Sequence, residues 1–182
     1  MSAVDIGKIV RASARLNGVL LDGVIDEIEL PTIETETEED ASLALIGKPE
    51  YRLKMEPLEC TITCTSYHPE LDAATSDQIS QHELIVRKNV EIYRGGVLAD
   101  EKPLVVVLRG RFKETPGGDL SGGELAEWEY VMYPTYYSKT YDGQEILALD
   151  VAANIYRVKG VDLLERMRAN LGIQGAVLGN VA

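Results

Sequence analysis

The fold of this chain is decided by residues 136–150, YYSKTYDGQEILALD, in which Asp142 and Gly143 separate two strand-like runs. An Asp-Gly pair is a strong signal for a two-residue β-hairpin turn, because both central residues of that turn need a positive φ. Farther along, Asp162 can cap a helix and Gly172 can end it. This helix is predicted to carry one apolar face, made by Leu163, Leu164, Met167 and Leu171.

Alternation of apolar and polar residues, which is typical of half-buried strands, runs through the rest of the chain. Residues 58–65, LECTITCT, predict a strand with one buried and one wet face. Tyr51, Leu53 and Met55 alternate in the same way, and Pro57 separates the two runs. Residues 104–108 are apolar on both faces and predict a well-covered central strand. We therefore expect a mainly β, antiparallel sandwich or barrel-like fold with one or two short helices, a second helix being possible between residues 68 and 81.

The length of 182 residues suits one domain spanning residues 1–182. A chain of this size buries roughly 70% of its unfolded surface, so its core needs no disulfides or metals. No run of about 18 apolar residues is present, and no membrane segment is expected. The N-terminus lacks the basic start and apolar block of a secretory signal.

The charge is strongly acidic and uneven. A net charge of −12 argues against a protein that grips the phosphates of nucleic acid. No Lys or Arg occurs between Arg15 and Lys48, whereas nine Asp and Glu residues fall there: Asp22, Asp26, Glu27, Glu29, Glu34, Glu36, Glu38, Glu39 and Asp40. This segment is either a solvated acidic edge or part of a passage for a polyanion.

The residues that usually carry chemistry form no recognisable site. Cys60 and Cys64 are about 13 Å apart if they share a strand, too far for a disulfide or a shared metal, and are better explained as buried apolar residues. His68 and His82 each lie beside one carboxylate without forming a dyad. Neither a phosphate-binding loop nor a nucleophile elbow is present. We predict no enzyme activity, no catalytic residue, no cofactor and no metal.

Tyrosines gather around Pro134. Tyr combines a large apolar ring with a polar tip, which suits contacts between subunits, and Tyr133, Tyr136 and Tyr137 are the candidates. The equally weighted alternative is that these rings cover one edge of the core.

The order of these features resembles the tail tube proteins of contractile-tailed phages (myovirus-type) and R-type bacteriocins. The segment from Tyr136 to Gly172 is the most specific part of the resemblance. Residues 16–31 look like the family's opening strand, which closes on Leu30-Pro31, and residues 59–65 look like its inner-sheet strand. Residues 41–48 are more apolar than the corresponding hairpin of the family.

The resemblance implies a structural virion protein that self-assembles into stacked hexameric rings. These rings form the inner tail tube, through which DNA passes into the host without specific binding. Residues 41–57 would form an extended hairpin between rings, and residues 173–182 a C-terminal tail. Three apolar residues are candidates for the contact with the next ring: Leu43, Leu45 and Ile46.

The resemblance also implies partners and a location. The partners are the tail sheath protein, the baseplate and tail terminator proteins, and a tape measure protein in the lumen. The protein belongs in the phage tail and is assembled in the bacterial host cytoplasm. Expected lumen-facing residues are Glu59, Thr61, Thr63 and Thr65 first, then Glu27 and Glu29.

Two alternatives stay open at this point. One is a stacked-ring tube, or a tube-end or baseplate adaptor, of a phage-derived injection or secretion system. The other, more remote, is a β-barrel ligand-binding protein.

Overall fold

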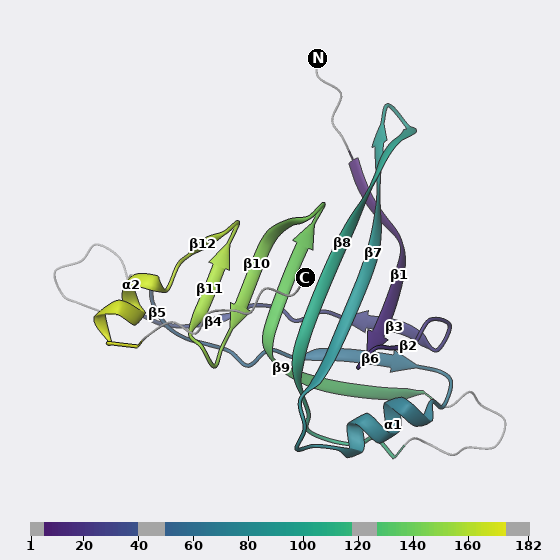
Figure 1. Ribbon diagram of the computed structural model, residues 1–182, viewed down its shortest axis with the longest axis horizontal. Coiled ribbons are helices and arrows are strands. Elements are labelled where there is room, and N and C mark those ends of the chain that lie inside the picture. The colour runs from purple at the N-terminus through teal and green to yellow at the C-terminus, as the bar shows by residue number, and fades with distance from the viewer. Residues whose placement is uncertain (1–5, 40–49, 118–126, 174–182) are drawn as a thin grey trace.

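The computed structural model describes residues 6–39, 50–117 and 127–173. Within these residues the chain is mainly β (Figure 1). The elements in chain order are β1 (Ile6–Leu16), β2 (Val19–Leu20), β3 (Ile25–Glu29), β4 (Thr35–Glu39), β5 (Glu50–Met55), β6 (Cys60–Cys64), α1 (Pro69–Ser76), β7 (His82–Arg94), β8 (Val97–Phe112), β9 (Trp128–Tyr141), β10 (Gln144–Asp150), β11 (Ile155–Val158), β12 (Val161–Asp162) and α2 (Glu165–Asn170). The predicted antiparallel β fold with short helices is confirmed, and over the described residues its strands do not close into a barrel.

The long strands β7 and β8 form the centre of the main sheet. In the described part of the chain its order is β12-β11-β10-β9-β8-β7-β1-β2, and the pairings are antiparallel. The β7–β8 hairpin extends beyond its neighbours, at the top of Figure 1. At one end of the sheet, β2 pairs with β1 only at Arg15 and Leu16, so most of the outer side of β1 has no strand beside it among the described residues.

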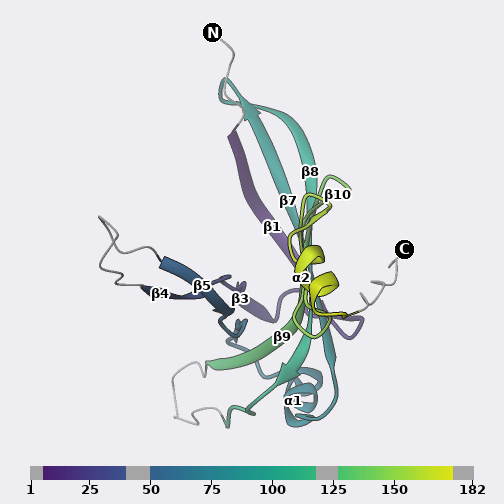
Figure 2. The ribbon, with the colours of Figure 1, turned by 90° about the vertical axis from the view of Figure 1, so that its left-hand side faces the viewer.

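A second layer is made by β3, β6 and the first part of β9. Residues 128–132 of β9 pair with β6, whereas residues 136–141 pair with β8, so β9 belongs to both layers. β3 and β6 run across the strands of the main sheet and lie to one side of it (Figures 1 and 2). Between the layers lies the core, where Ile62, Val86, Leu108 and Tyr137 are at most 2% exposed.

The passage of β9 from one layer to the other depends on Gly110. The register between β8 and β9 shifts next to Gly110, which pairs with Pro134. A Cβ atom on Gly110 would lie 2.3 Å from the backbone oxygen of Tyr133, closer than real Cβ contacts allow. Proline usually interrupts a strand, but β9 continues through Pro134, because the missing side chain of Gly110 lets the two backbones approach at the bend.

The tight turns follow the local sequence. Asp142 (φ 50°) and Gly143 (φ 74°) connect β9 to β10, which confirms the predicted hairpin. Gly95 and Gly96 turn β7 into β8 with φ values of 63° and 84°. Both turns use two residues with positive φ, the geometry that matches the right-handed twist of paired strands. Pro57 separates β5 from β6 as predicted, and α1 lies between residues 68 and 81, where the sequence allowed a helix.

The central strand β8 is covered on one face only. Val106 and Leu108 are fully buried against the second layer, whereas Val105 and Val107 on the opposite face are partly exposed. The prediction that residues 104–108 are well covered on both faces is therefore wrong for the described chain. An apolar run alone does not distinguish a strand buried within one subunit from one that is half covered.

Candidate functional surfaces

The first candidate surface is an acidic ribbon on the second layer, defined here as Glu27, Glu29, Glu59, Thr61, Thr63 and Glu129. The pairing of β3 with β6 sets Glu27 opposite Thr63 and Glu29 opposite Thr61. On the other side of β6, Glu129 of β9 pairs with Thr63. Since the alternate residues of β6 are buried in the core, the ribbon faces away from it.

Sheet pairing thus brings together five predicted residues from two separate stretches of the sequence: Glu27 and Glu29 in one, and Glu59, Thr61 and Thr63 in the other. Beside the ribbon, a hollow of about 250 Å³ is lined by Glu29, Glu34, Glu56 and Glu59 among others. Thr65 lies past the end of β6, where its backbone N–H donates to Asp26 Oδ2 at 2.7 Å. Glu129 was missed in the sequence, because nothing near it in the chain indicates that β9 pairs with β6.

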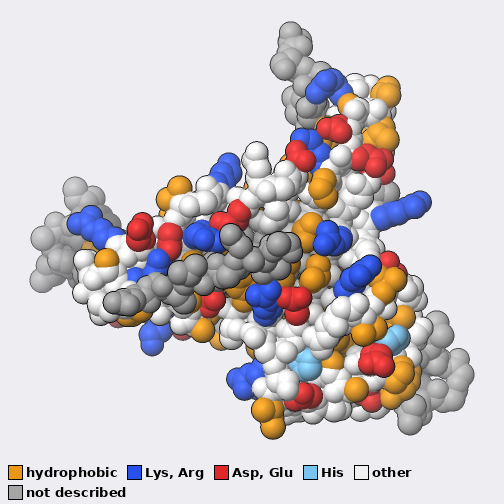
Figure 3. Space-filling view, viewed as in Figure 1, with side chains coloured by type: hydrophobic (Ala, Val, Ile, Leu, Met, Phe, Trp, Pro, Cys, Tyr) orange, Lys and Arg blue, Asp and Glu red, His pale blue; other side chains and the backbone are white. Residues whose placement is uncertain are grey.

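The opposite face of the molecule has a mixed charge. Figure 3 looks onto the side of the main sheet that is turned away from β3 and β6, where Lys and Arg side chains are interspersed with acidic ones. Arg109 Nε lies 2.6 Å from Glu83 Oε2, and Arg157 Nη2 lies 2.7 Å from Glu145 Oε2. This pairing neutralises much of the local charge, so the acidic ribbon is the better candidate for repelling a polyanion.

The tyrosines around Pro134 divide into two environments. Tyr137 is 2% exposed and packs in the core, so the alternative of core coverage is correct for this residue and its ring is unavailable to another subunit. Tyr133 and Tyr136 are partly exposed. The Arg109 guanidinium lies 5.1 Å from the centre of the Tyr136 ring, and Lys113 Nζ lies 5.4 Å from that of Tyr133. Burial, followed by the nearby Glu59 charge, raises the pKa of Tyr133.

The β4–β5 hairpin forms a separate two-stranded sheet that projects from the body of the molecule (Figure 2). Tyr51 is 53% exposed and Leu53 is 51% exposed. The expected buried face of this run is therefore absent in the single described chain, because no third strand or helix covers the hairpin there. The predicted contact residues Leu43, Leu45 and Ile46 lie outside the described residues, as does the tail segment 174–182.

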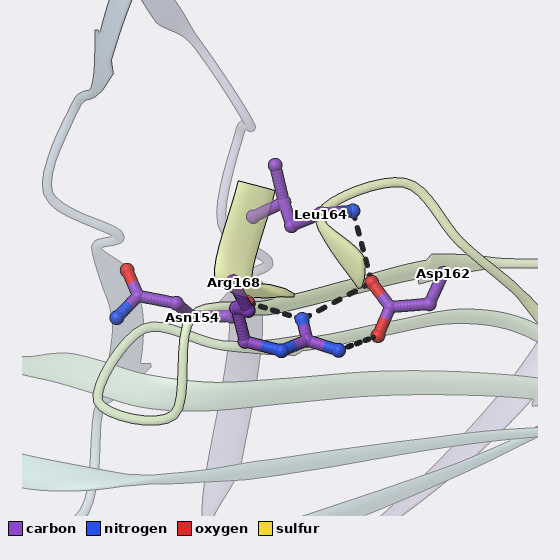
Figure 4. Close-up of polar contacts among 4 residues, drawn as sticks. All are labelled: Asn154, Asp162, Leu164 and Arg168. Carbon is purple, nitrogen blue, oxygen red and sulfur yellow. Dashed lines mark hydrogen bonds and ion pairs between the residues drawn. The ribbon is translucent and has the colours of Figure 1, made fainter. Parts of the chain in front are cut away.

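The C-terminal helix α2 is held by a buried arginine, the contact drawn in Figure 4. Arg168 Nη1 donates to the backbone oxygen of Asn154 at 2.6 Å, and Nη2 donates to Asp162 Oδ2. Asp162 Oδ1 accepts from the backbone N–H of Leu164 at 2.9 Å, in place of a regular helix cap. The prediction that Asp162 caps the helix is therefore wrong, because the N-cap position is taken by Leu164 without a side-chain cap. Asp162 instead ties the start of α2 to β12 through an ion pair that the sequence did not indicate.

The predicted burial of the helix face is reversed. Arg168 is 8% exposed, whereas Leu163, Met167 and Leu171 are 52%, 38% and 64% exposed. The reason is that Arg168 finds two acceptors on the strand side, which makes its burial possible. An apolar stripe is consequently left on the outer side of α2.

The pair between Arg168 and Asp162 predicts an acid-sensitive attachment of α2. Hydrogen bonds from Arg168 hold the pKa of Asp162 below its ordinary value. A carboxyl group whose folded pKa is lowered stabilises the fold above its unfolded pKa, and this contribution is lost as the pH falls through the folded pKa. We expect residues 165–170 to lose protection against hydrogen exchange, relative to the intrinsic exchange rate at each pH, below about pH 4, near the ordinary Asp pKa.

Two variants check this expectation. Asp162→Asn is expected to give fast exchange of α2 at pH 7 and to remove the acid step. Asp142→Asn is the control, because the Lys102–Asp142 pair is exposed and the Asn keeps the turn. A wild-type helix whose protection is unchanged between pH 6 and pH 3 would contradict the role of this pair.

Cys60, Cys64 and His82 are buried. Cys60 and Cys64 are fully buried, as predicted, and burial raises the pKa of their thiols to about 12 and about 11. His82 Nε2 donates to the Asp77 backbone oxygen at 3.0 Å, so its Nδ1 accepts from the Asn17 amide at 2.9 Å. These contacts connect the β1–β2 turn to the segment that follows α1.

The described residues contain no group of three or more His, Cys, Asp or Glu side chains arranged to hold a metal ion. They also contain no helix with the length and apolar character needed to span a membrane.

Comparison with known proteins places these surfaces in a family context. The family described as phage tail tube protein FII matches residues 7–172 of the chain. A segment of 68 residues is 41% identical to the tail tube protein of Escherichia phage P2. This alignment covers 37% of the present chain and 40% of the phage P2 protein.

Proposed function

Because the chain belongs to the phage tail tube protein FII family, we propose that it forms the inner tube of a contractile phage tail. In this proposal six copies form a ring, and rings stack into a hollow conduit for DNA. The family match over residues 7–172 is the observation that carries the proposal. The assembled tube is part of the virion and is built in the cytoplasm of the bacterial host.

The open edge of β1 supports ring formation. Leu21 N–H donates to the Ala14 backbone oxygen, so the edge without a strand partner among the described residues runs over residues 7–13. Unpaired strand edges readily pair with another chain. A contact between the β1 edge and a different edge of the next copy is head-to-tail, and such contacts close into a ring when the rotation allows.

The acidic ribbon supports a lumen that does not bind DNA. Its four glutamates and the net charge of −12 repel a polyanion, so DNA would slide through without specific contacts. In this arrangement Glu27, Glu29, Glu59, Thr61, Thr63 and Thr65 line or border the passage.

The remaining surfaces are assigned to partners. Tyr133 and Tyr136, whose rings are partly exposed, are proposed to contact a neighbouring subunit. The proposed heterologous partners are the tail sheath on the outside, a tape measure protein in the lumen, and the baseplate and tail terminator proteins at the two ends of the tube.

Negative-stain electron microscopy of the concentrated protein tests the proposal. Long hollow tubes of uniform width are the expected result. Single rings or short stacks would favour a tube-end or baseplate adaptor, because such a protein does not polymerise without limit. Compact monomers at every concentration, even with baseplate added as a template, would contradict the proposal and favour the ligand-binding alternative.

Charge reversal in the ribbon gives a second test. The double variant Glu27→Lys, Glu29→Lys is expected to form tubes but to slow DNA ejection, because cations in the lumen attract phosphates. Ejection by single particles is followed by fluorescence of the released DNA. Glu70→Lys on α1 is the control for an exposed acid elsewhere. Normal ejection by the double variant would exclude these residues from the lumen, and loss of tubes would place them in a subunit contact.

A further inference from the structure

The turn between β1 and β2 consists of Asn17 and Gly18, which have φ values of 49° and 84°. Leu16 and Val19 pair on either side of it, so these two residues are the centre of a tight hairpin turn. Both are exposed. A Cβ placed on Gly18 would meet no atom of the described residues within 4 Å, so the backbone of Gly18 is open to approach on that side.

An asparagine that is followed by glycine can modify itself. The backbone nitrogen of Gly18 can attack Cγ of Asn17, because glycine has no side chain to hinder the approach. A C–N bond forms, the bond from Cγ to Nδ2 breaks, and ammonia leaves with the proton of the Gly18 N–H. Water then opens the resulting succinimide ring and leaves either aspartate or isoaspartate. Water is the only co-reactant that this deamidation needs.

The Asn17 side chain is held against the beginning of β7. Asn17 Oδ1 accepts from the backbone N–H of Glu83 at 2.9 Å, and Asn17 Nδ2 donates to His82 Nδ1 at 2.9 Å. The Asn17 backbone N–H also donates to the Glu83 oxygen at 2.8 Å. These three hydrogen bonds are called the Asn17 clamp here. Rotation of the side chain toward the Gly18 nitrogen breaks the two bonds that its amide group makes.

The surroundings of His82 make it an acceptor for this amide. The ring is 6% exposed, and its centre lies 5.5 Å from that of the Phe112 ring. His82 Nε2 donates to the backbone oxygen of Asp77 at 3.0 Å, so Nδ1 is left to accept from Asn17 Nδ2. A carboxylate in place of the Asn17 amide would set two acceptors against each other. The clamp therefore fits the amide and disfavours the deamidated product.

We propose that Asn17 is a deamidation site that the Asn17 clamp keeps inactive in the folded chain. Modification then requires local opening of the β1–β2 turn, so its rate follows the fraction of molecules in which the turn is open. Loss of one hydrogen bond raises that fraction by about fivefold. An isoaspartate adds a main-chain atom to the turn, which would shift the pairing of Leu16 with Val19 at the end of β1.

Peptide mapping by mass spectrometry tests the proposal. Trypsin releases residues 16–52 as one peptide, because Lys48 is followed by Pro49, and Asn17 is the only Asn or Gln in that peptide. The protein is incubated in mildly alkaline buffer, either folded or in urea, and the change of the peptide from amide to acid is followed by its mass. The rate in urea is expected to exceed that of the folded wild type by at least about tenfold.

Two variants separate the clamp from overall stability. His82→Phe removes the acceptor and keeps an aromatic ring beside Phe112, so it is expected to raise the rate in the folded protein by about fivefold. Tyr137→Ala is the control, because it removes a core side chain from β9, which is not adjacent to β1 in the sheet. This control is expected to leave the rate unchanged as long as the protein is folded.

Four results would overturn the proposal. Equal rates in urea and in buffer would show that the fold gives no protection, and an unmodified peptide after incubation in urea would show that Asn17 is not a deamidation site. A wild-type rate in folded His82→Phe would remove His82 from the clamp. Equal increases in both variants would show that modification follows global unfolding. The comparison of urea with buffer uses the wild type alone, so it decides the proposal even if a variant does not fold.

Discussion

Replacing Gly110 by alanine is expected to lower the free energy of unfolding by about 3 kcal/mol, at the upper end of overpacking effects. The added Cβ would lie 2.3 Å from the Tyr133 backbone oxygen and 2.5 Å from Pro134 Cα. Both neighbours are backbone atoms at the bend where β9 passes between the layers, so no side chain can rotate to relieve the clash. Urea denaturation of the monomer measures the effect.

Gly117→Ala is the matched control. A Cβ on Gly117 meets no atom of the described residues within 4 Å, and its φ is not in the left-handed region. The substitution is expected to change stability by less than about 1 kcal/mol, in the stabilising direction, because alanine restricts the unfolded chain. Equal urea midpoints for the two variants would show that the bend tolerates a side chain at Gly110. Our explanation of how β9 connects the layers would then be wrong.

Replacing Tyr137 by alanine is expected to cost about 3–5 kcal/mol of stability, as for other large aromatic residues in a core. Tyr137 is 2% exposed between the two layers, and the truncation would leave a cavity there. The neighbouring Tyr136→Ala is expected to cost less than about 1 kcal/mol, because it removes one partly exposed contact with Arg109.

The same pair of variants separates folding from assembly. If Tyr136 contacts another subunit, Tyr136→Ala will fold normally and form fewer or shorter tubes. Thermal unfolding of the monomer and electron microscopy of the concentrated protein measure the two properties. Similar losses of stability in both variants would contradict the assignment of Tyr137 to the core and Tyr136 to the surface.

The candidate surfaces were only partly predictable. The sequence indicated a polar face on residues 58–65 and named Glu27 and Glu29 as further lumen candidates, and the structure adds that Glu27, Thr63 and Glu129 lie side by side. The sequence also predicted a helix after Asp162, but it did not indicate that Arg168 would be the buried residue of that helix. Tyr136 and Tyr137 were treated alike, although one belongs to the surface and the other to the core.

Local sequence by itself determined the turns and the strand periodicity. The turn at Asp142 and Gly143, the break at Pro57 and the alternation over residues 58–65 depend on adjacent residues, whose backbone preferences act without distant partners. Only the tertiary structure decided that Gly110 permits the bend of β9, that Arg168 faces inward, and that one side of β8 stays half open. Each of these features depends on groups that are far apart in the chain. Gly110 meets a backbone oxygen of β9, Arg168 meets two acceptors, and β8 is covered by a second layer on one side only. Periodicity defines the two faces of an element, and the partner that packs against it determines which face is buried.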